Sequence, residues 1–92
     1  MIQTFRCPDT ESLFVTGKSR RFAAIKVVAE RKLQQLDSAA TLAFLRSPPG
    51  NRLEALAGDR TGRYSIRIND QWQLCFEWTE RGPAQVEIVD YH

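Results

Sequence analysis

The spacing of apolar residues changes once along this chain of 92 residues, and that change constrains the fold more than any other feature. Between Phe22 and Leu36, apolar side chains recur every three or four positions, which predicts an amphipathic helix. From Tyr64 onward, apolar and polar residues alternate in "RYSIRINDQWQLCFEW" and again in "AQVEIVDYH", which predicts strands. The prolines of "SPPG" at residues 47–50 separate the two halves, because proline removes a backbone donor and restricts the residue before it.

Shorter elements are expected in the N-terminal half. The segment "MIQTFRC" at residues 1–7 is short and has the composition of a strand. In the residues after it, Asp9 or Thr10 is expected to cap a short helix that runs through Phe14 and is closed by Gly17.

Further elements complete the expected order. A further helix is expected to start at Asp37 or Ser38. After it, a short strand is expected in "RLEAL" at residues 52–56 and a turn in "GDRTG" at residues 58–62. The order of strand, helices and strands indicates one α+β domain over residues 1–92. In this domain the N-terminal strand and two or three helices pack on a mostly antiparallel, twisted sheet.

The hairpin between the two longest strand patterns has a preferred register. A turn of two residues pairs Ile66 with Gln73 and mixes the polar and apolar faces. A loop of three residues, 69–71, pairs Ile66 with Leu74 and buries one consistent face. The same register sets Arg67 opposite Gln73 on the polar face, close enough for the two side chains to share one ligand.

Composition is that of a globular protein, with 42% hydrophobic and 26% charged residues. No apolar run approaches the roughly 18 residues of a membrane span, and the N-terminus lacks the apolar run of a signal peptide, so a cytoplasmic protein is expected. Cys7 and Cys75 lack the spacing of metal ligands and are expected to be reduced thiols. With a single histidine, neither a metal site nor a cofactor is expected.

Positive charge is concentrated in the first half of the chain, where residues 1–50 hold eight Lys or Arg against four Asp or Glu. The surplus is densest in "GKSRRFAAIKVVAERK". Such a stripe suits a phosphate backbone or an acidic protein partner, and its alternative is a solvated helix face. The basic residues singled out are those of the stripe, Lys18, Arg20, Arg21, Lys26, Arg31 and Lys32, together with Arg52 and Arg60 at the edges of the predicted sheet.

The last predicted strand ends in Asp90, Tyr91 and His92. Histidine exchanges protons near neutral pH. Beside Arg67, a phenol and a histidine suit phosphoryl chemistry on RNA. One group helps the ribose 2′-hydroxyl attack, another protonates the leaving oxygen, and arginine stabilises the phosphate. The structural alternative is a rim tyrosine, a local acceptor at Asp90 and an incidental terminal histidine.

The run "GDRTGRYSIRINDQWQLCFEW" together with "VEIVDYH" resembles the HigB group of bacterial toxins. This group includes the GraT-like branch and is part of the wider RelE/ParE superfamily. The segments "MIQTFRCPDTESLFVTGKSRRF" and "SPPGNRLEAL" are similar to the GraT-like branch, so the resemblance covers essentially the whole chain.

The resemblance implies a RelE-like fold and the toxin of a type II toxin–antitoxin pair, which cuts messenger RNA in the ribosomal A site without a metal ion. It also implies a HigA- or GraA-like antitoxin with a helix-turn-helix domain. The toxin would contact operator DNA only through this antitoxin. Asp90, Tyr91 and His92 match the C-terminal motif on which family activity depends. The basic stripe would contact ribosomal RNA, where phosphate contacts position without specifying sequence.

Two departures from the family bear on activity. Familiar members carry an arginine after the tryptophan of the second hairpin strand, where this chain has Gln73, and some carry His and Lys at the positions of Glu54 and Ala57. Loss of an arginine at transition-state charge commonly costs on the order of a hundredfold in rate, and Arg67 is expected to substitute in part. An attenuated toxin that binds antitoxin and ribosome is therefore one alternative. A gyrase-poisoning protein of the ParE branch is another, although that branch lacks the Asp-Tyr-His end.

Overall fold

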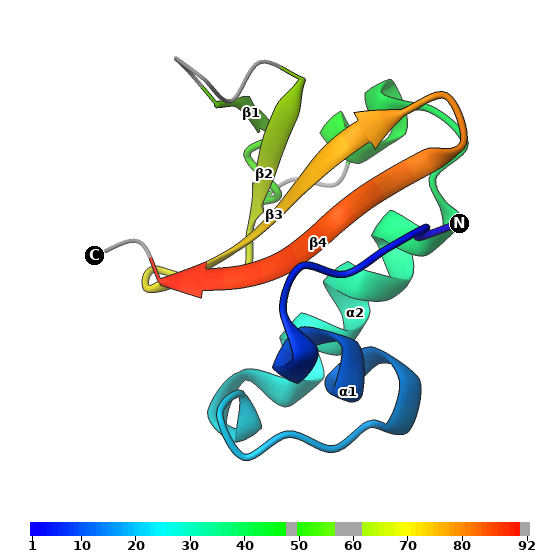
Figure 1. Cartoon of the computed structure of the whole chain (residues 1–92). Coiled ribbons are helices and arrows are strands. Elements are labelled where there is room, and N and C mark those ends of the chain that lie inside the picture. The colour runs from blue at the N-terminus through cyan, green and yellow to red at the C-terminus, as the bar shows by residue number, and fades with distance from the viewer. Residues whose placement is uncertain (48–49, 57–61, 91–92) are drawn as a thin grey trace.

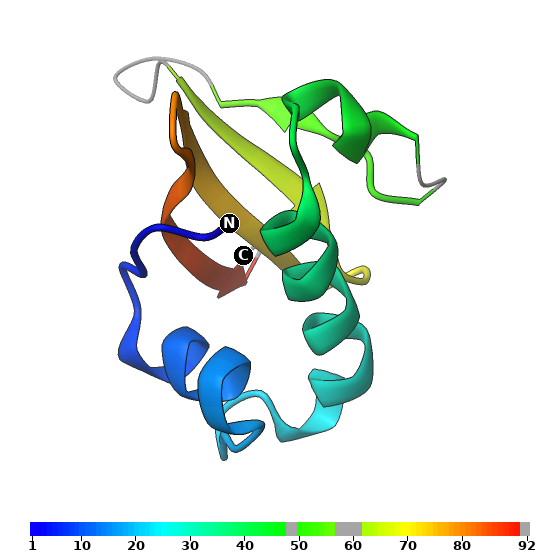
Figure 2. The same cartoon turned by 90° about the vertical axis from the view of Figure 1, so that its right-hand side faces the viewer.

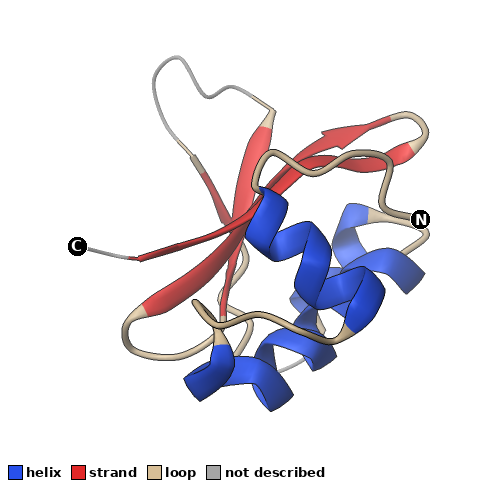
Figure 3. Cartoon of the chain, turned by 60° about the horizontal axis from the view of Figure 1, so that its bottom comes forward, coloured by secondary structure: helices blue, strands red, loops and turns tan. Residues whose placement is uncertain are grey.

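The computed structural model describes residues 1–47, 50–56 and 62–90. Four strands form one antiparallel sheet in the order β1-β2-β3-β4, and Figure 1 shows its twist. The helices lie together on one side of this sheet (Figures 2 and 3), as an α+β fold predicts. The elements, with η for 3-10 helices, are α1 (Pro8–Thr16), η1 (Ala23–Ile25), α2 (Lys26–Ser38), η2 (Leu42–Arg46), β1 (Glu54–Ala55), β2 (Arg63–Arg67), β3 (Trp72–Thr79) and β4 (Gly82–Asp90).

One cluster of buried side chains joins the helices to the sheet. Leu13 of α1 and Leu33 of α2 are fully buried together with Ile66, Leu74 and Ile88 of the three long strands. Because successive side chains of a strand point to opposite faces, the residues between these strand positions face away from the helices. We call this second face the outer face; it carries Ser65, Arg67, Gln73, Cys75, Glu87 and Val89.

The predicted register of the β2–β3 hairpin is confirmed. Ile66 pairs with Leu74, and Arg67 pairs with Gln73. The side-chain oxygen of Asn69 accepts hydrogen bonds from the backbone N–H groups of Gln71 and Trp72, both at 2.8 Å. This asparagine turn closes the three-residue loop and so fixes the register.

The helices differ from the prediction mainly at their ends. Helix α1 ends as predicted at Gly17, which adopts the left-handed conformation with φ 72°. The helix expected after Asp37 or Ser38 is instead the 3-10 turn η2, where the Thr41 hydroxyl accepts a hydrogen bond from the backbone N–H of Phe44. In the part of the chain that the structure describes, no helix is long and apolar enough to cross a membrane.

The prediction of an N-terminal strand at residues 1–7 is wrong for this structure. The segment runs along β4 (Figure 1), but it forms only one isolated parallel bridge, between Phe5 and Val86. The apolar residues of the segment therefore suffice to place it beside β4. They do not suffice to form a continuous ladder of strand hydrogen bonds.

An irregularity in β4 explains the short pairing and has a consequence for the outer face. Gln85 has a φ of 52°, and the pairing of β3 with β4 shifts register at this point. The N–H groups of Gln85 and Val86 turn toward Thr4, donating to its hydroxyl at 2.9 Å and to its carbonyl at 3.1 Å. The N–H of Arg6 then donates to the Val86 carbonyl at 2.9 Å. A bulge of this kind interrupts a ladder, and here it fixes Arg6 beside β4.

Gly82 gives a test of how firmly the N-terminal segment is held. Its φ is 129°, and a Cβ added there would lie 2.5 Å from the backbone oxygen of Met1. At Gly50, φ is 91° and no described atom lies within 4 Å of an added Cβ. We expect Gly82→Ala to lower the free energy of unfolding by about 1–3 kcal/mol more than Gly50→Ala, because only the first adds a clash to the positive φ. Urea unfolding of both variants measures the difference, and equal losses would show that the segment moves aside freely.

Candidate active site

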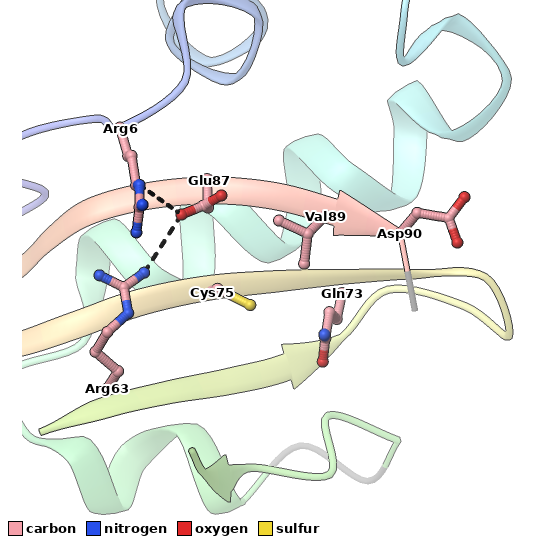
Figure 4. Close-up of a pocket in the computed structure, with 7 residues that line it drawn as sticks. All are labelled: Arg6, Arg63, Gln73, Cys75, Glu87, Val89 and Asp90. Atoms are coloured by element: carbon pink, nitrogen blue, oxygen red, sulfur yellow. Dashed lines mark hydrogen bonds and ion pairs between the residues drawn. The ribbon is translucent and has the colours of Figure 1, made fainter. Parts of the chain in front are cut away.

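A pocket of about 330 Å³ opens on the outer face. The register sets Gln73 beside Val89 and Cys75 beside Glu87, so β3 and β4 direct two rows of side chains into it. Figure 4 shows these side chains together with two arginines from other segments. The pocket is lined by Arg6, Arg63, Gln73, Cys75, Glu87, Val89 and Asp90.

Two of the predicted catalytic residues, Gln73 and Asp90, line this pocket. Gln73 lies on the outer face, and Asp90 lies at the end of the pocket, where Figure 4 shows its carboxylate directed away from Gln73. Asp90 is the last residue of β4, opposite Trp72, and its Oδ2 accepts a hydrogen bond at 3.0 Å from the side-chain amide of Gln71. The hairpin loop thus helps to orient the carboxylate. Tyr91 and His92 lie outside the described residues, as does Arg60.

Arg67 lies on the outer face beside Gln73, as predicted, but its guanidinium forms an ion pair with Asp70 of the hairpin loop. The side chain of Asp70 is almost fully exposed. An ion pair with a partner this exposed is typically worth about 0–1 kcal/mol, because water solvates the Asp70 carboxylate well. A phosphate near Gln73 can therefore compete with Asp70 for Arg67 at little cost.

Arg6 and Arg63 share one carboxylate at the other end of the pocket. Glu87 Oε2 lies 3.4 Å from Arg6 Nε and 3.4 Å from Arg63 Nη2. The Arg63 side chain is only 13% exposed, whereas that of Arg6 is 61% exposed. The pocket therefore has one largely buried and one exposed guanidinium at this end.

Lys32 departs from the predicted basic stripe. Its side chain turns inward, where Nζ donates a hydrogen bond to Oδ1 of the fully buried Asn51. The Asn51 amide donates in turn to the carbonyl of Leu45 at 3.1 Å and to Gln35 at 3.2 Å. The Asn51 carbonyl accepts the backbone N–H of Arg67. Lys32 therefore supports the end of β2, and through it the position of Arg67.

Burial lowers the pKa of Lys32 from its ordinary value of 10.5, and the positive charges of Arg31 and Arg67 lower it further. The folded chain thus holds this proton less tightly than the unfolded chain does.

The other basic residues of the stripe are exposed, and four of them line a shallow groove between α1 and the start of α2. Arg21 has local partners there, because its Nη1 lies 3.6 Å from Asp9 Oδ2 and its guanidinium stacks 5.2 Å from the ring centre of Phe22. Arg31 is exposed farther along α2. We call this surface the basic groove; its cations are Lys18, Arg20, Arg21 and Lys26.

Sequence reasoning missed Arg6, Arg63 and Glu87. The alternation in "RYSIR" carries a signal for Arg63, because it places this residue on the same face as Arg67. No such signal exists for Arg6, whose position depends on the bulge at Gln85. Across residues 1–47, 50–56 and 62–90, no three histidine, cysteine or carboxylate side chains gather as a metal site requires.

The buried lysine gives a pH-dependent prediction. We expect the free energy of unfolding of the parent, relative to Lys32→Met, to rise as the pH increases through the alkaline range below 10.5. In that window the unfolded chain binds more protons at Lys32 than the folded chain, so raising the pH relieves the cost of the buried charge. Urea unfolding at several pH values measures this. Lys26→Met, at an exposed position of the same helix, is the control, and the same pH trend in both variants would refute the prediction.

Comparison with known proteins agrees with the resemblance found in the sequence. The family model described as the RelE-like toxin of type II toxin-antitoxin system HigB matches residues 4–92. Toxin HigB-1 of Vibrio cholerae serotype O1 is 47% identical over 94 residues, which cover 100% of this chain and 98% of that protein. Endoribonuclease HigB of Proteus vulgaris is 28% identical over 93 residues, which cover 100% of both chains. The chain therefore belongs to the HigB family of RelE-like toxins of type II toxin–antitoxin systems.

Proposed function

We propose that this HigB-family toxin cleaves messenger RNA on the ribosome, with the C-terminal Asp-Tyr-His motif at the cut site. The observation that carries the proposal is that Gln73 and Asp90 line one pocket, with Arg67 paired to Gln73 on the polar outer face. The similarity to a relative named Endoribonuclease HigB supports the same reaction class.

The chemistry follows from the groups available. A general base takes the proton of the ribose 2′-hydroxyl, the 2′-oxygen attacks the adjacent phosphorus, and the 5′-oxygen leaves with a proton from a general acid. Tyr91 and His92 supply the base and the acid, while Asp90 orients them. The products are a 2′,3′-cyclic phosphate and a free 5′-hydroxyl, and no step needs a metal ion.

Arg67 and Gln73 are the proposed groups at the reacting phosphate. Gln73 donates hydrogen bonds from its amide but adds no charge, so stabilisation of the developing negative charge falls to Arg67. Arg67 reaches the phosphate by exchanging its exposed partner Asp70 for it.

Binding to the ribosome is assigned to a different surface. The basic groove presents four exposed cations on loop and helix, away from the strands that line the pocket. Together with Arg31 and Arg60, these cations would contact the phosphates of ribosomal RNA and hold the toxin in a fixed orientation. A cognate antitoxin with a helix-turn-helix domain would complete the cytoplasmic pair and carry its contact with operator DNA.

Removal of Tyr91 and His92 tests the assignment of acid and base. We expect the truncated protein to lose cleavage of a defined messenger on purified 70S ribosomes by about a thousandfold or more, because both proton-transfer groups are gone. Primer extension across the ribosomal A site measures the cut. Antitoxin binding and the thermal unfolding midpoint are the controls for folding, and full cleavage by the truncated protein would refute the assignment.

Replacement of Gln73 tests whether this toxin is attenuated. In an attenuated toxin, Gln73→Arg is expected to raise the cleavage rate by roughly a hundredfold, because it adds a charged donor at the reacting phosphate. Gln34→Arg adds the same charge at an exposed position of α2 and serves as the control. An unchanged rate in Gln73→Arg would show that Arg67 suffices and that the parent is a fully active nuclease.

A further inference from the structure

We propose that Arg6 and Arg63 form a second phosphate subsite, which holds the RNA phosphate next to the one that is cut, and that Glu87 is a counter-ion which this phosphate displaces. The proposal deepens the proposed function and depends on it for the ligand, a single strand of RNA.

Arg6 and Arg63 are arranged as an anion-binding site, and the carboxylate of Glu87 occupies it. Figure 4 shows Glu87 between the two guanidinium groups, which reach it from β2 and from the N-terminal segment. Both contacts go to the same oxygen, Oε2, and both measure 3.4 Å. Charge-assisted hydrogen bonds between such groups are usually nearer 2.7–2.9 Å, so Glu87 fits the pair loosely. A phosphate, with more oxygens and more charge, can accept donors from both arginines at once.

Burial gives the three side chains different mobility. Arg63 and Glu87 are 13% and 20% exposed, so the sheet holds them in place. Arg6 is 61% exposed; its backbone N–H donates to Val86, and its side chain contacts Glu87. Arg63 thus provides a fixed donor in a partly dehydrated wall, where charge interactions are stronger than in water, and Arg6 can close over a ligand from the side.

The register places this subsite at a suitable distance from the cut site. Glu87 pairs with Cys75, and the next outward-facing pair toward the end of β4 is Val89 with Gln73. Two residues along a strand cover roughly 6–7 Å. Adjacent phosphates of an extended single strand are separated by a similar length. Arg63 is paired with Glu77, one outward-facing pair beyond Cys75, and its guanidinium reaches back to Glu87. A strand with one phosphate at Gln73 therefore brings its neighbour to Glu87, where the two guanidinium groups meet.

The charge of the pocket explains why Glu87 matters. The two arginines are balanced by two carboxylates, Glu87 and Asp90, so the charged side chains that line the pocket sum to zero. RNA meets a positive subsite only when it displaces Glu87. The free toxin should consequently bind RNA weakly and with little discrimination against other anions, while RNA delivered by the ribosome can complete the exchange.

The test is the affinity of the free, full-length toxin for a fluorescent 2′-O-methyl RNA of ten nucleotides, measured by anisotropy over a range of salt. Arg63→Gln and Arg6→Gln are each expected to weaken binding roughly tenfold, since each removes a charged donor to phosphate. Glu87→Gln is expected to strengthen binding several-fold and to steepen its salt dependence. Arg81→Gln, an exposed arginine in the β3–β4 turn, is expected to stay within about twofold of the parent.

The outcomes separate this proposal from the proposed function, because the probe has no free 2′-hydroxyl and cannot be cut. The expected affinities in a chain that does not cleave messenger RNA would support the subsite and overturn only the nuclease. Weaker binding by Glu87→Gln, or unchanged binding by both arginine variants, would overturn the subsite and leave an ion pair that only stabilises the fold. Loss of antitoxin binding without loss of RNA binding would also overturn it, since the arginines would then serve a carboxylate of that partner. Arg6→Gln keeps the test valid if Arg63→Gln does not fold.

Discussion

The burial of one face of β2, β3 and β4 under the helices is the constraint on which the rest of the structure depends. Ile66, Leu74 and Ile88 lie in adjacent register positions and are covered by helix residues. A slip of one residue would expose this row, so the register is strongly specified. The same alternation sends Gln73 and Glu87 to the outer face. The site is thus a direct consequence of how the core is built.

Segments distant in sequence complete the outer face through backbone contacts. The bulge at Gln85 ties the N-terminal segment to β4 and brings Arg6 to Glu87. On the other side of the sheet, Lys32 and Asn51 support the end of β2 near Arg67. In each case a buried polar pair or a strained backbone residue holds an arginine near the pocket. Such costly arrangements favour a functional role over simple packing.

Charge is divided between two surfaces with different properties. The basic groove carries an excess of exposed cations, suited to salt-sensitive contact with a nucleic-acid backbone. The pocket, in contrast, pairs its arginines with carboxylates. Under the proposed function, such a toxin would gain its affinity from the first surface and limit unwanted RNA binding at the second. This division is consistent with a nuclease that acts where RNA is presented to it.

The sequence by itself determined the elements that depend on local periodicity. These are helix α2, the β2–β3 hairpin with Arg67 opposite Gln73, the α+β class and the family. Contacts between distant segments were decided only by the tertiary structure, because no local pattern encodes them. These contacts are the interrupted pairing of residues 1–7 with β4, the hydrogen bond from Lys32 to Asn51, and the ion pair of Arg6 with Glu87. The spacing of apolar residues depends only on the order of residues along the chain. The partner of a charged side chain depends on which distant segments the fold places beside it.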